Sequence, residues 1–334
     1  MHILESGIDT QRTDDGSTTF PLVLICEPND ATLDMTADWI RLNRRMLYQK
    51  SVQHGAILFR GFPLSSDHDF DAFVTAFGLP AFTYENSLSN AVRKNRTPRV
   101  FTANEAPSDV TICLHHEMAQ TPVYPSRLFF FCEQPAASGG ATPLCRSDVL
   151  FERIRLELPE FAADCRNKGL RYSHVMPGSN DAASGMGRSW QSTWNASTRS
   201  EAEARMSELG YTWAWQDDDC LKVTTPVLPA VKDLDARRTS FFNQLIAAFA
   251  GWKDARNDPV KSIRFGDDSP LDRPTIDRVI RMAEEITFDL KWQAGDVALV
   301  DNYVTMHGRR SFDGTRSVLA SLVGSSSGPG EQLS

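Results

Sequence analysis

The run RLFFFC at positions 127–132 constrains the fold more than any other segment of the chain. It is apolar and aromatic without alternation, which is the pattern of a strand whose two faces are both covered. Such a strand needs a packed layer on each side. The run therefore predicts the interior of a sheet at the centre of a layered core.

The other predicted elements place strands toward both ends of the chain and helices in the middle. Gly139-Gly140 predicts a turn, and residues 141–146 predict a return strand that forms a β-hairpin or a neighbouring pair with 127–132. Helices are expected at 36–50, 67–77, 147–169, 199–209, 236–250 and 271–286. Further strands are expected at 55–62, 292–302 and 316–324. This order favours an α+β protein with a mainly β core and a long helix-rich insertion.

The ends of the chain set the expected domain organisation. Residues 1–18 are polar and are expected to be a flexible N-terminus, and residues 325–334, rich in Ser, Gly and Pro, a flexible tail. Between them, residues 19–324 are expected to form a single domain with the insertion at about 150–290.

Charge and hydropathy exclude two classes of partner. The net charge of -8 argues against nucleic acid, which attracts clustered Lys and Arg. The short basic stretch at 93–96 is interpreted as a solvated loop. No apolar run approaches a membrane span, and the first residues lack the features of a signal peptide, so we expect no membrane association and a cytoplasmic location.

The segment Leu114-His115-His116-Glu117 carries the chemistry. In a strand, residues i and i+2 point to the same face, so His115 and Glu117 can converge on one ion while His116 points away. A third ligand must come from elsewhere, and among the seven histidines His174 and His307 remain as candidates. Two His and one carboxylate suit iron(II), and the H-E-x-x-H helix of zinc proteases is absent.

Several motifs in one order resemble the taurine dioxygenase and clavaminate synthase-like family of iron(II)/2-oxoglutarate oxygenases. The motifs are GAILFRGF at 55–62, FTANE at 101–105, LHHEMA at 114–119, GGATPL at 139–144 and GDVALVDNYVTMHGRRSFDGTR at 295–316. The resemblance implies a double-stranded β-helix, or jelly-roll, with flanking helices. It also implies an enzyme that uses Fe(II), with 2-oxoglutarate and dioxygen as co-substrates.

The resemblance also assigns roles to single residues. His115, Glu117 and His307 match the iron ligands, Thr142 matches the residue that hydrogen-bonds 2-oxoglutarate, and Arg316 matches the arginine that pairs with its distal carboxylate. A guanidinium suits that role because it meets a carboxylate in a two-pronged fork.

The arginines Arg309 and Arg310 compete with Arg316 for the carboxylate, or face the substrate or a surface acid. For Thr142, the alternative is a turn hydroxyl that bonds local backbone. The carboxylate of Glu117 favours oxygenation, because related halogenases carry a small residue at that position.

Four further residues are candidates for substrate binding. Asn104 and Glu105 correspond to a pocket wall in the resembled family, or else form a capped turn. Arg188 and Trp190 lie in a glycine-flanked segment that can close as a lid over a substrate carboxylate and its apolar part, or else pack structurally.

The expected function is hydroxylation of an unactivated C–H bond in a small amino-acid-like substrate, free or tethered to a carrier protein, in natural product biosynthesis. The same centre can instead desaturate, epoxidise or cyclise its substrate. A different class of function is the remaining alternative: a non-catalytic metal-binding or regulatory module with the same fold. The resemblance selects no single substrate and no oligomeric state.

Overall fold

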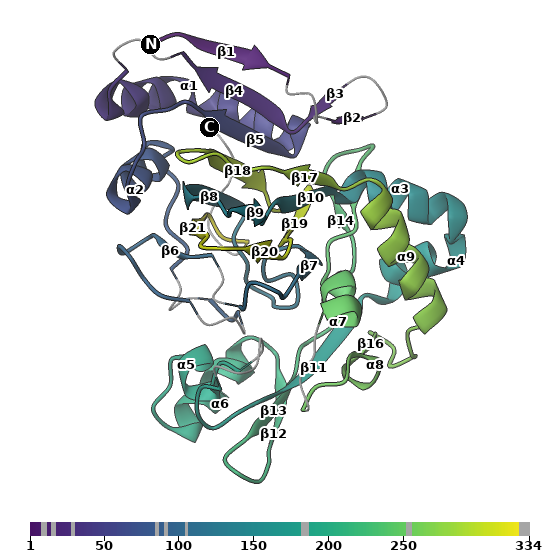
Figure 1. The fold of residues 1–334 in the computed structure, drawn as a ribbon. Helices are drawn as coiled ribbons and strands as arrows, with labels where there is room; N and C mark the ends of the chain where they lie inside the picture. Colours follow the sequence, from purple (N-terminus) through teal and green to yellow (C-terminus); the bar gives the residue numbers. More distant parts are fainter. Residues whose placement is uncertain are drawn as a thin grey trace.

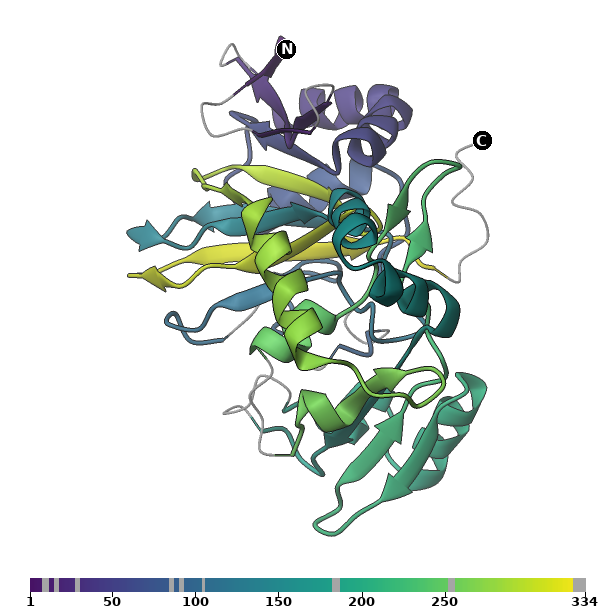
Figure 2. The same cartoon turned by 90° about the vertical axis from the view of Figure 1, so that its right-hand side faces the viewer.

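The computed structural model describes residues 1–7, 12–14, 18–27, 31–83, 87–89, 93–103, 106–181, 187–251 and 256–326. Two sheets face each other at its centre, with helices on their outer faces and a smaller lobe at one end (Figure 1). The second view shows the long strands of the larger sheet side by side, with the smaller lobe below them (Figure 2).

The larger sheet has seven strands with β8 near its middle. In spatial order they are β1 (Ile3–Ser6), β4 (Leu22–Cys26), β5 (Ala56–Arg60), β18 (Val297–Asp301), β8 (Arg127–Gln134), β21 (Ser317–Val323) and β6 (Phe101–Thr102). Phe129 and Phe131 of β8 pack with the outer helices, whereas Leu128 and Phe130 pack toward the second sheet. The prediction of a strand covered on both faces is confirmed.

The smaller sheet carries the candidate ligands. Its strands, in spatial order, are β17 (Phe288–Leu290), β10 (Thr142–Arg146), β19 (Thr305–Arg309) and β7 (Ile112–His115). The prediction that 141–146 returns beside 127–132 is wrong, because β10 pairs with β17 and β19 and so belongs to the opposite sheet. The turn before it instead forms β9 (Ser138–Gly139), which pairs with β20 (Phe312–Asp313). Apolar residues of both sheets meet between them, as in a jelly-roll.

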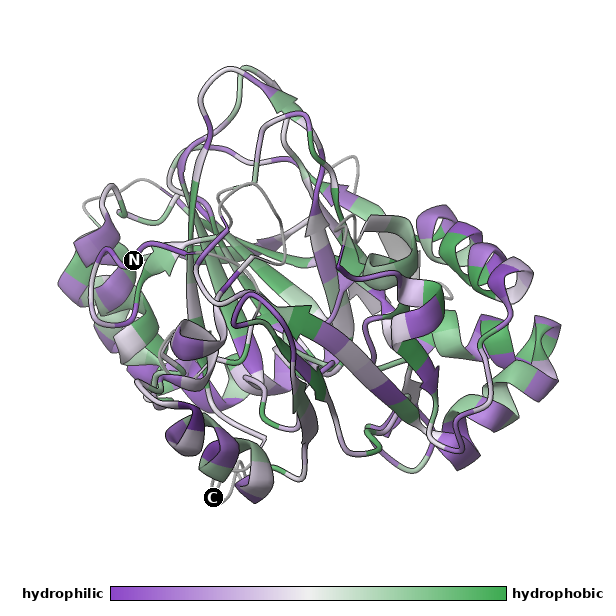
Figure 3. Cartoon of the chain, turned by 90° about the horizontal axis from the view of Figure 1, so that it is seen from below, coloured by the Kyte–Doolittle hydropathy of each residue, from purple (hydrophilic) through white to green (hydrophobic). Residues whose placement is uncertain are grey.

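Helices cover the outer faces of both sheets. On the larger sheet lie α1 (Leu33–His54) and α2 (Asp67–Ala76), and on the smaller sheet α3 (Ser147–Glu157), α4 (Pro159–Lys168), α7 (Leu245–Gly251) and α9 (Arg273–Glu285). The hydropathy view shows the apolar strands inside and polar residues on the outer helices (Figure 3).

Three predicted segments differ from the structure. The helix expected at 147–169 is two helices, because Pro159 breaks it after Leu158. The helix expected at 236–250 begins only at Leu245, where Asn243 accepts the first N–H, and the residues before it include β15 (Thr239–Ser240). The start expected to be flexible includes β1, paired with β4, and β2 (Arg12–Asp14), paired with β3 (Thr18–Phe20).

We call residues 170–224 the lobe. Around a small apolar cluster it combines β11 (Leu170–Met176), α5 (Trp190–Trp194), α6 (Arg199–Glu208), β12 (Thr212–Trp215) and β13 (Leu221–Thr224). Its sheet is extended by β16 (Ile263–Phe265), and the short elements α8 (Pro259–Ser262) and β14 (Lys232–Asp233) lie nearby in the chain. The predicted insertion therefore contains strands as well as helices.

Candidate metal centre

The two sheet strands β7 and β19 bring the candidate ligands together. His115 and His307 are directly paired residues in the register of these strands, and their ring centroids lie 4.3 Å apart. The ligand atoms of His115, Glu117 and His307 all lie within 4.8 Å of one another. Of the two histidines left open by spacing alone, His307 therefore joins the group.

Gly308 allows the two strands to approach this closely. A Cβ at this position would lie 2.3 Å from the backbone oxygen of Ile112, a distance that no side chain tolerates. The register also shifts between His307 and Arg309. The close contact that places His307 beside His115 therefore requires a glycine at position 308.

Glu117 reaches the site from a turn and not from a strand. The prediction that His115 and Glu117 share one strand face is wrong, because β7 ends at His115 and the chain turns at Met118, where φ is 59°. The side chain of Asn302 holds this turn: it accepts from the Glu117 N–H at 2.8 Å and donates to the Glu117 carbonyl at 3.0 Å.

His116 points away from the group, as predicted, but it is fully buried. Its ring bonds the backbone oxygen of Asn302 and the hydroxyl of Ser147, and burial lowers its pKa to about 3. A neutral ring bonded on both sides serves the packing of the turn.

The remaining donor atoms fit a divalent metal. Burial lowers the pKa of His115 and of His307, so both rings are neutral near neutral pH. The Nδ1 atom of His115 lies 2.8 Å from the carbonyl of Cys113, which can only accept; the lone pair of Nε2 is therefore free. His307 Nε2 lies 3.7 Å from a Glu117 oxygen, too far for a hydrogen bond between them. Two neutral imidazoles and a carboxylate form a typical iron(II) donor set.

Arg93 lies beside the group and was not found from the sequence. The prediction that 93–96 is a solvated loop is wrong at this residue, whose side chain is only 7% exposed and donates to a Glu117 oxygen at 2.8 Å. Its guanidinium also covers the ring of Phe101 at 5.0 Å. Arg96 fits the prediction better, since it is 38% exposed and pairs with surface acids.

Arg316 has the open guanidinium that a carboxylate needs. Its Nε donates to the Gly140 carbonyl at 3.0 Å, and within the described part of the chain no acid lies at ion-pair distance. Burial, followed by repulsion from Arg309, lowers its pKa to about 10, so it stays charged at neutral pH.

Thr142 is placed with its hydroxyl ready to donate. It is buried, and its oxygen accepts from the indole N–H of Trp292 at 2.9 Å. Because the oxygen already accepts there, the hydroxyl hydrogen remains for a carboxylate. Trp292, which the sequence indicated only as part of a strand, fixes this hydroxyl.

The two competing arginines are engaged elsewhere. Arg309 donates to the backbone oxygens of Ala106, Pro107 and Val110. Arg310 pairs with Asp289 and Glu284, which matches the alternative of a surface acid.

The expected lid residues, Arg188 and Trp190, are packed against other parts of the protein. Arg188 is 2% exposed and donates to the backbone oxygens of Ser87, Ser89 and Ser192. Trp190 is buried, with its N–H on Asp219. These contacts favour the structural alternative. The other two substrate candidates, Asn104 and Glu105, lie outside the described residues.

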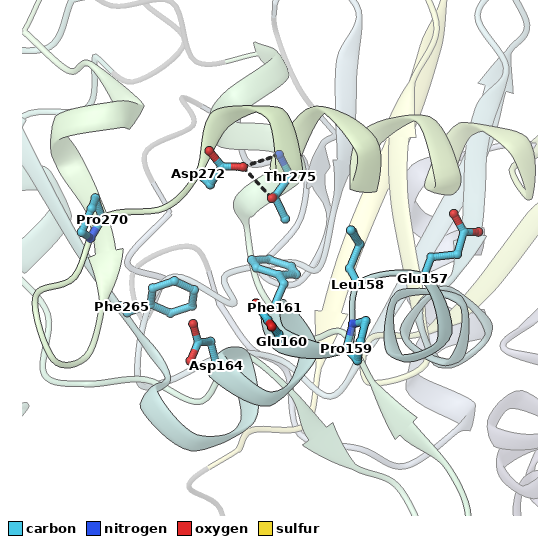
Figure 4. Close-up of a pocket in the computed structure, with 10 residues that line it drawn as sticks. All are labelled: Glu157, Leu158, Pro159, Glu160, Phe161, Asp164, Phe265, Pro270, Asp272 and Thr275. Atoms are coloured by element: carbon cyan, nitrogen blue, oxygen red, sulfur yellow. Dashed lines mark hydrogen bonds between the residues drawn. The ribbon is translucent and has the colours of Figure 1, made fainter.

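A cavity of about 490 Å³ lies apart from the candidate ligands, between α4 and α9 (Figure 4). Phe161 and Phe265 form its apolar wall, and Asp272 caps α9 by accepting from Thr275. None of the residues that line it belongs to the ligand group.

No helix among the described residues is long and apolar enough to cross a membrane.

Comparison with known proteins gives matches over most of the chain. Residues 20–322 match the family described as taurine catabolism dioxygenase TauD, TfdA family. A clavaminate synthase-like protein of Arabidopsis thaliana is 40% identical over 292 residues, which cover 87% of this chain and 88% of that protein. The dapdiamide synthesis protein DdaC of Enterobacter agglomerans is 26% identical over 286 residues, covering 81% and 82%.

Solved structures share the fold. A crystal structure described as a putative α-ketoglutarate-dependent taurine dioxygenase from Burkholderia xenovorans matches with a TM-score of 0.50 at 14% identity, covering 91% of this chain and 89% of that chain. The PvcB protein of Pseudomonas aeruginosa also has a TM-score of 0.50, at 13% identity and with 91% and 85% covered.

Proposed function

This chain belongs to the TauD/TfdA family and is a 2-oxoglutarate-dependent non-haem iron dioxygenase, and from that premise we propose that it hydroxylates a small amino-acid-like substrate. Its cofactor is Fe(II), and its co-substrates are 2-oxoglutarate and dioxygen. The observation that carries the residue assignment is the convergence of His115, Glu117 and His307, whose ligand atoms all lie within 4.8 Å of one another. In this proposal the three residues hold the metal.

Thr142 and Arg316 bind 2-oxoglutarate in the same proposal. The Arg316 guanidinium receives the distal carboxylate in a fork, and the Thr142 hydroxyl donates a hydrogen bond to a carboxylate oxygen. A Cβ on Gly140 would lie 3.0 Å from Arg316 Cδ, so a glycine at this position avoids a steric clash with the Arg316 side chain. Together these two groups orient the co-substrate.

The iron supplies the oxidising chemistry, coupling decarboxylation of 2-oxoglutarate to succinate with oxygen transfer to a substrate C–H bond. The protein positions the metal ligands and keeps water away from the site. His307 and Glu117 are 7% and 5% exposed, so little water reaches the site. Asn302 fixes the Glu117 turn, and the paired strands fix both histidines. Supporting contacts of this kind hold ligands in place and affect metal affinity.

The substrate class rests on the relatives. One is named for likeness to clavaminate synthase and another for dapdiamide synthesis, and these names support an amino-acid-derived substrate in specialised metabolism. The substrate is free or tethered to a carrier protein. Desaturation, epoxidation or cyclisation would follow from a different placement of the same carbon.

Two measurements test this function. Adding iron(II) and 2-oxoglutarate without oxygen should give a weak visible charge-transfer band, and a library of amino acids and carrier-tethered amino acids should then reveal substrate-dependent succinate release in air. The matched control omits 2-oxoglutarate. An absent band together with no succinate from any compound would contradict the proposal.

A further inference from the structure

We propose that Arg93 is a receptor for a carboxylate of the substrate, an inference that rests on the proposed function. Arg93 meets Glu117 through Nη2 alone. Its Nε is buried, and neither Nε nor Nη1 has a hydrogen-bond partner among the described residues. A buried N–H of a charged group costs free energy unless it is paired, so Nε calls for an acceptor.

Two other arginines with little exposed side chain each pair with an acid through two donors. Arg60 donates to Asp296 through both Nε and Nη2, at 2.9 and 2.6 Å. Arg146 meets Asp148 in the same two-pronged way. Both close the Nε edge of the guanidinium against the carboxylate. Arg93 leaves that edge open beside the candidate metal ligands.

The position of Arg93 is fixed without the missing partner. Its guanidinium lies over the Phe101 ring, and its bond to Glu117 uses the carboxylate oxygen Oε1, while Oε2 is the oxygen near His307. Glu117 can therefore keep Oε2 for a metal while Arg93 holds Oε1. A guanidinium held in this way is preorganised, which lowers the entropic cost of binding a ligand.

The charge of the site favours an anionic ligand. The proposed site combines one carboxylate, Glu117, with two guanidinium groups, those of Arg93 and Arg316. Iron(II) adds two positive charges, and 2-oxoglutarate cancels two. One positive charge then remains, with that of Arg309 close by. A substrate with a carboxylate would offset it and match the fork of Arg93.

Fluorine NMR on the full chain tests this without relying on turnover. The protein is loaded with zinc(II), as a diamagnetic substitute for iron, and saturated with 2-oxoglutarate to occupy Arg316. Trifluoroacetate is the probe, and neutral trifluoroacetamide is its matched control. We expect trifluoroacetate to bind and trifluoroacetamide not to bind. The Arg93→Met substitution should weaken trifluoroacetate binding roughly tenfold or more, because it removes a charge-assisted hydrogen bond.

Three variants and a second anion separate the outcomes. Arg96→Met removes a charge from the same segment and should leave binding unchanged, and Arg93→Lys should restore part of it. Unchanged trifluoroacetate binding in Arg93→Met, or no binding to the wild type, would overturn the inference. Tighter binding of trifluoromethanesulfonate than of trifluoroacetate would overturn the assignment to carboxylates. The oxygenase function itself fails separately, through a missing charge-transfer band in the wild type.

Discussion

Arg188 in the lobe is buried and Arg316 beside Gly140 is partly buried, but the surroundings of these two arginines differ. Arg188 donates from all three nitrogens to oxygen atoms of Ser87, Ser89 and Ser192. Arg316 donates once, to Gly140. The first ties chain segments together, whereas the second has donors left for a ligand. In the proposed function, the unused donors of Arg316 receive 2-oxoglutarate.

The largest expected effect lies in the metal-binding region. His307→Ala removes one of three ligands, and because even an outer partner of a ligand is worth about 10–100-fold, succinate formation should fall by more than about 100-fold. Iron titration and thermal unfolding should show lost metal binding with a retained fold. Native rates of succinate formation would remove His307 from the site.

Arg316→Met sharpens the comparison next. The variant loses a partly buried charge partner of 2-oxoglutarate, so the co-substrate concentration for half-maximal rate should rise by about 100-fold. Arg310→Met is the matched control, because Arg310 pairs with Asp289 and Glu284 at the surface and should leave this value unchanged. An equal effect of both substitutions would contradict the role of Arg316.

Arg188→Met should act on stability instead. The substitution leaves several buried backbone oxygens without a hydrogen-bond donor. The free energy of unfolding should therefore fall by about 2–3 kcal/mol in denaturant titrations. The turnover of the folded fraction should stay the same. A raised substrate KM with unchanged stability would return Arg188 to the lid role and remove the contrast between the two regions.

The smallest effect concerns His174, in β11 of the lobe. Burial lowers its pKa to about 4, and its Nε2 has no hydrogen-bond partner among the described residues. Protonation therefore favours the unfolded state, and the stability from this group is complete above pH 6.5 and lost as the pH falls toward 4. His174→Gln should reduce the acid loss by about 1 kcal/mol at one pH unit below 6.5. Parallel stability curves of the two proteins would contradict this.

The sequence predicted the site's ligands better than their supports. His115, Glu117 and His307 follow from motifs, and the structure brings them together. Arg93 and Asn302 act through contacts with residues 24 and 185 positions away, which no local pattern reveals. In the sequence, a basic run has the same pattern whether its side chains are exposed or buried. The same holds for a polar residue that follows a strand.

The fold shows the same limit. Strong local patterns predicted the strands at 55–62 and 127–132 and the helix at 271–286. The pairing of β10 could not be predicted, because which sheet a strand joins depends on residues far along the chain. A hairpin was the simplest local choice, and the competing partners β17 and β19 lie more than a hundred residues away.

The pairing of β7 with β19 also orders events during synthesis. His115 and Glu117 leave the ribosome long before Asn302 and His307. The nascent chain therefore has one histidine and one carboxylate of the group, but it lacks both the Asn302 side chain that holds the Glu117 turn and the third donor, His307. Two isolated donors hold a metal weakly. In the proposed site, iron would therefore be loaded only into chains whose last strands have already been translated and have joined the sheet.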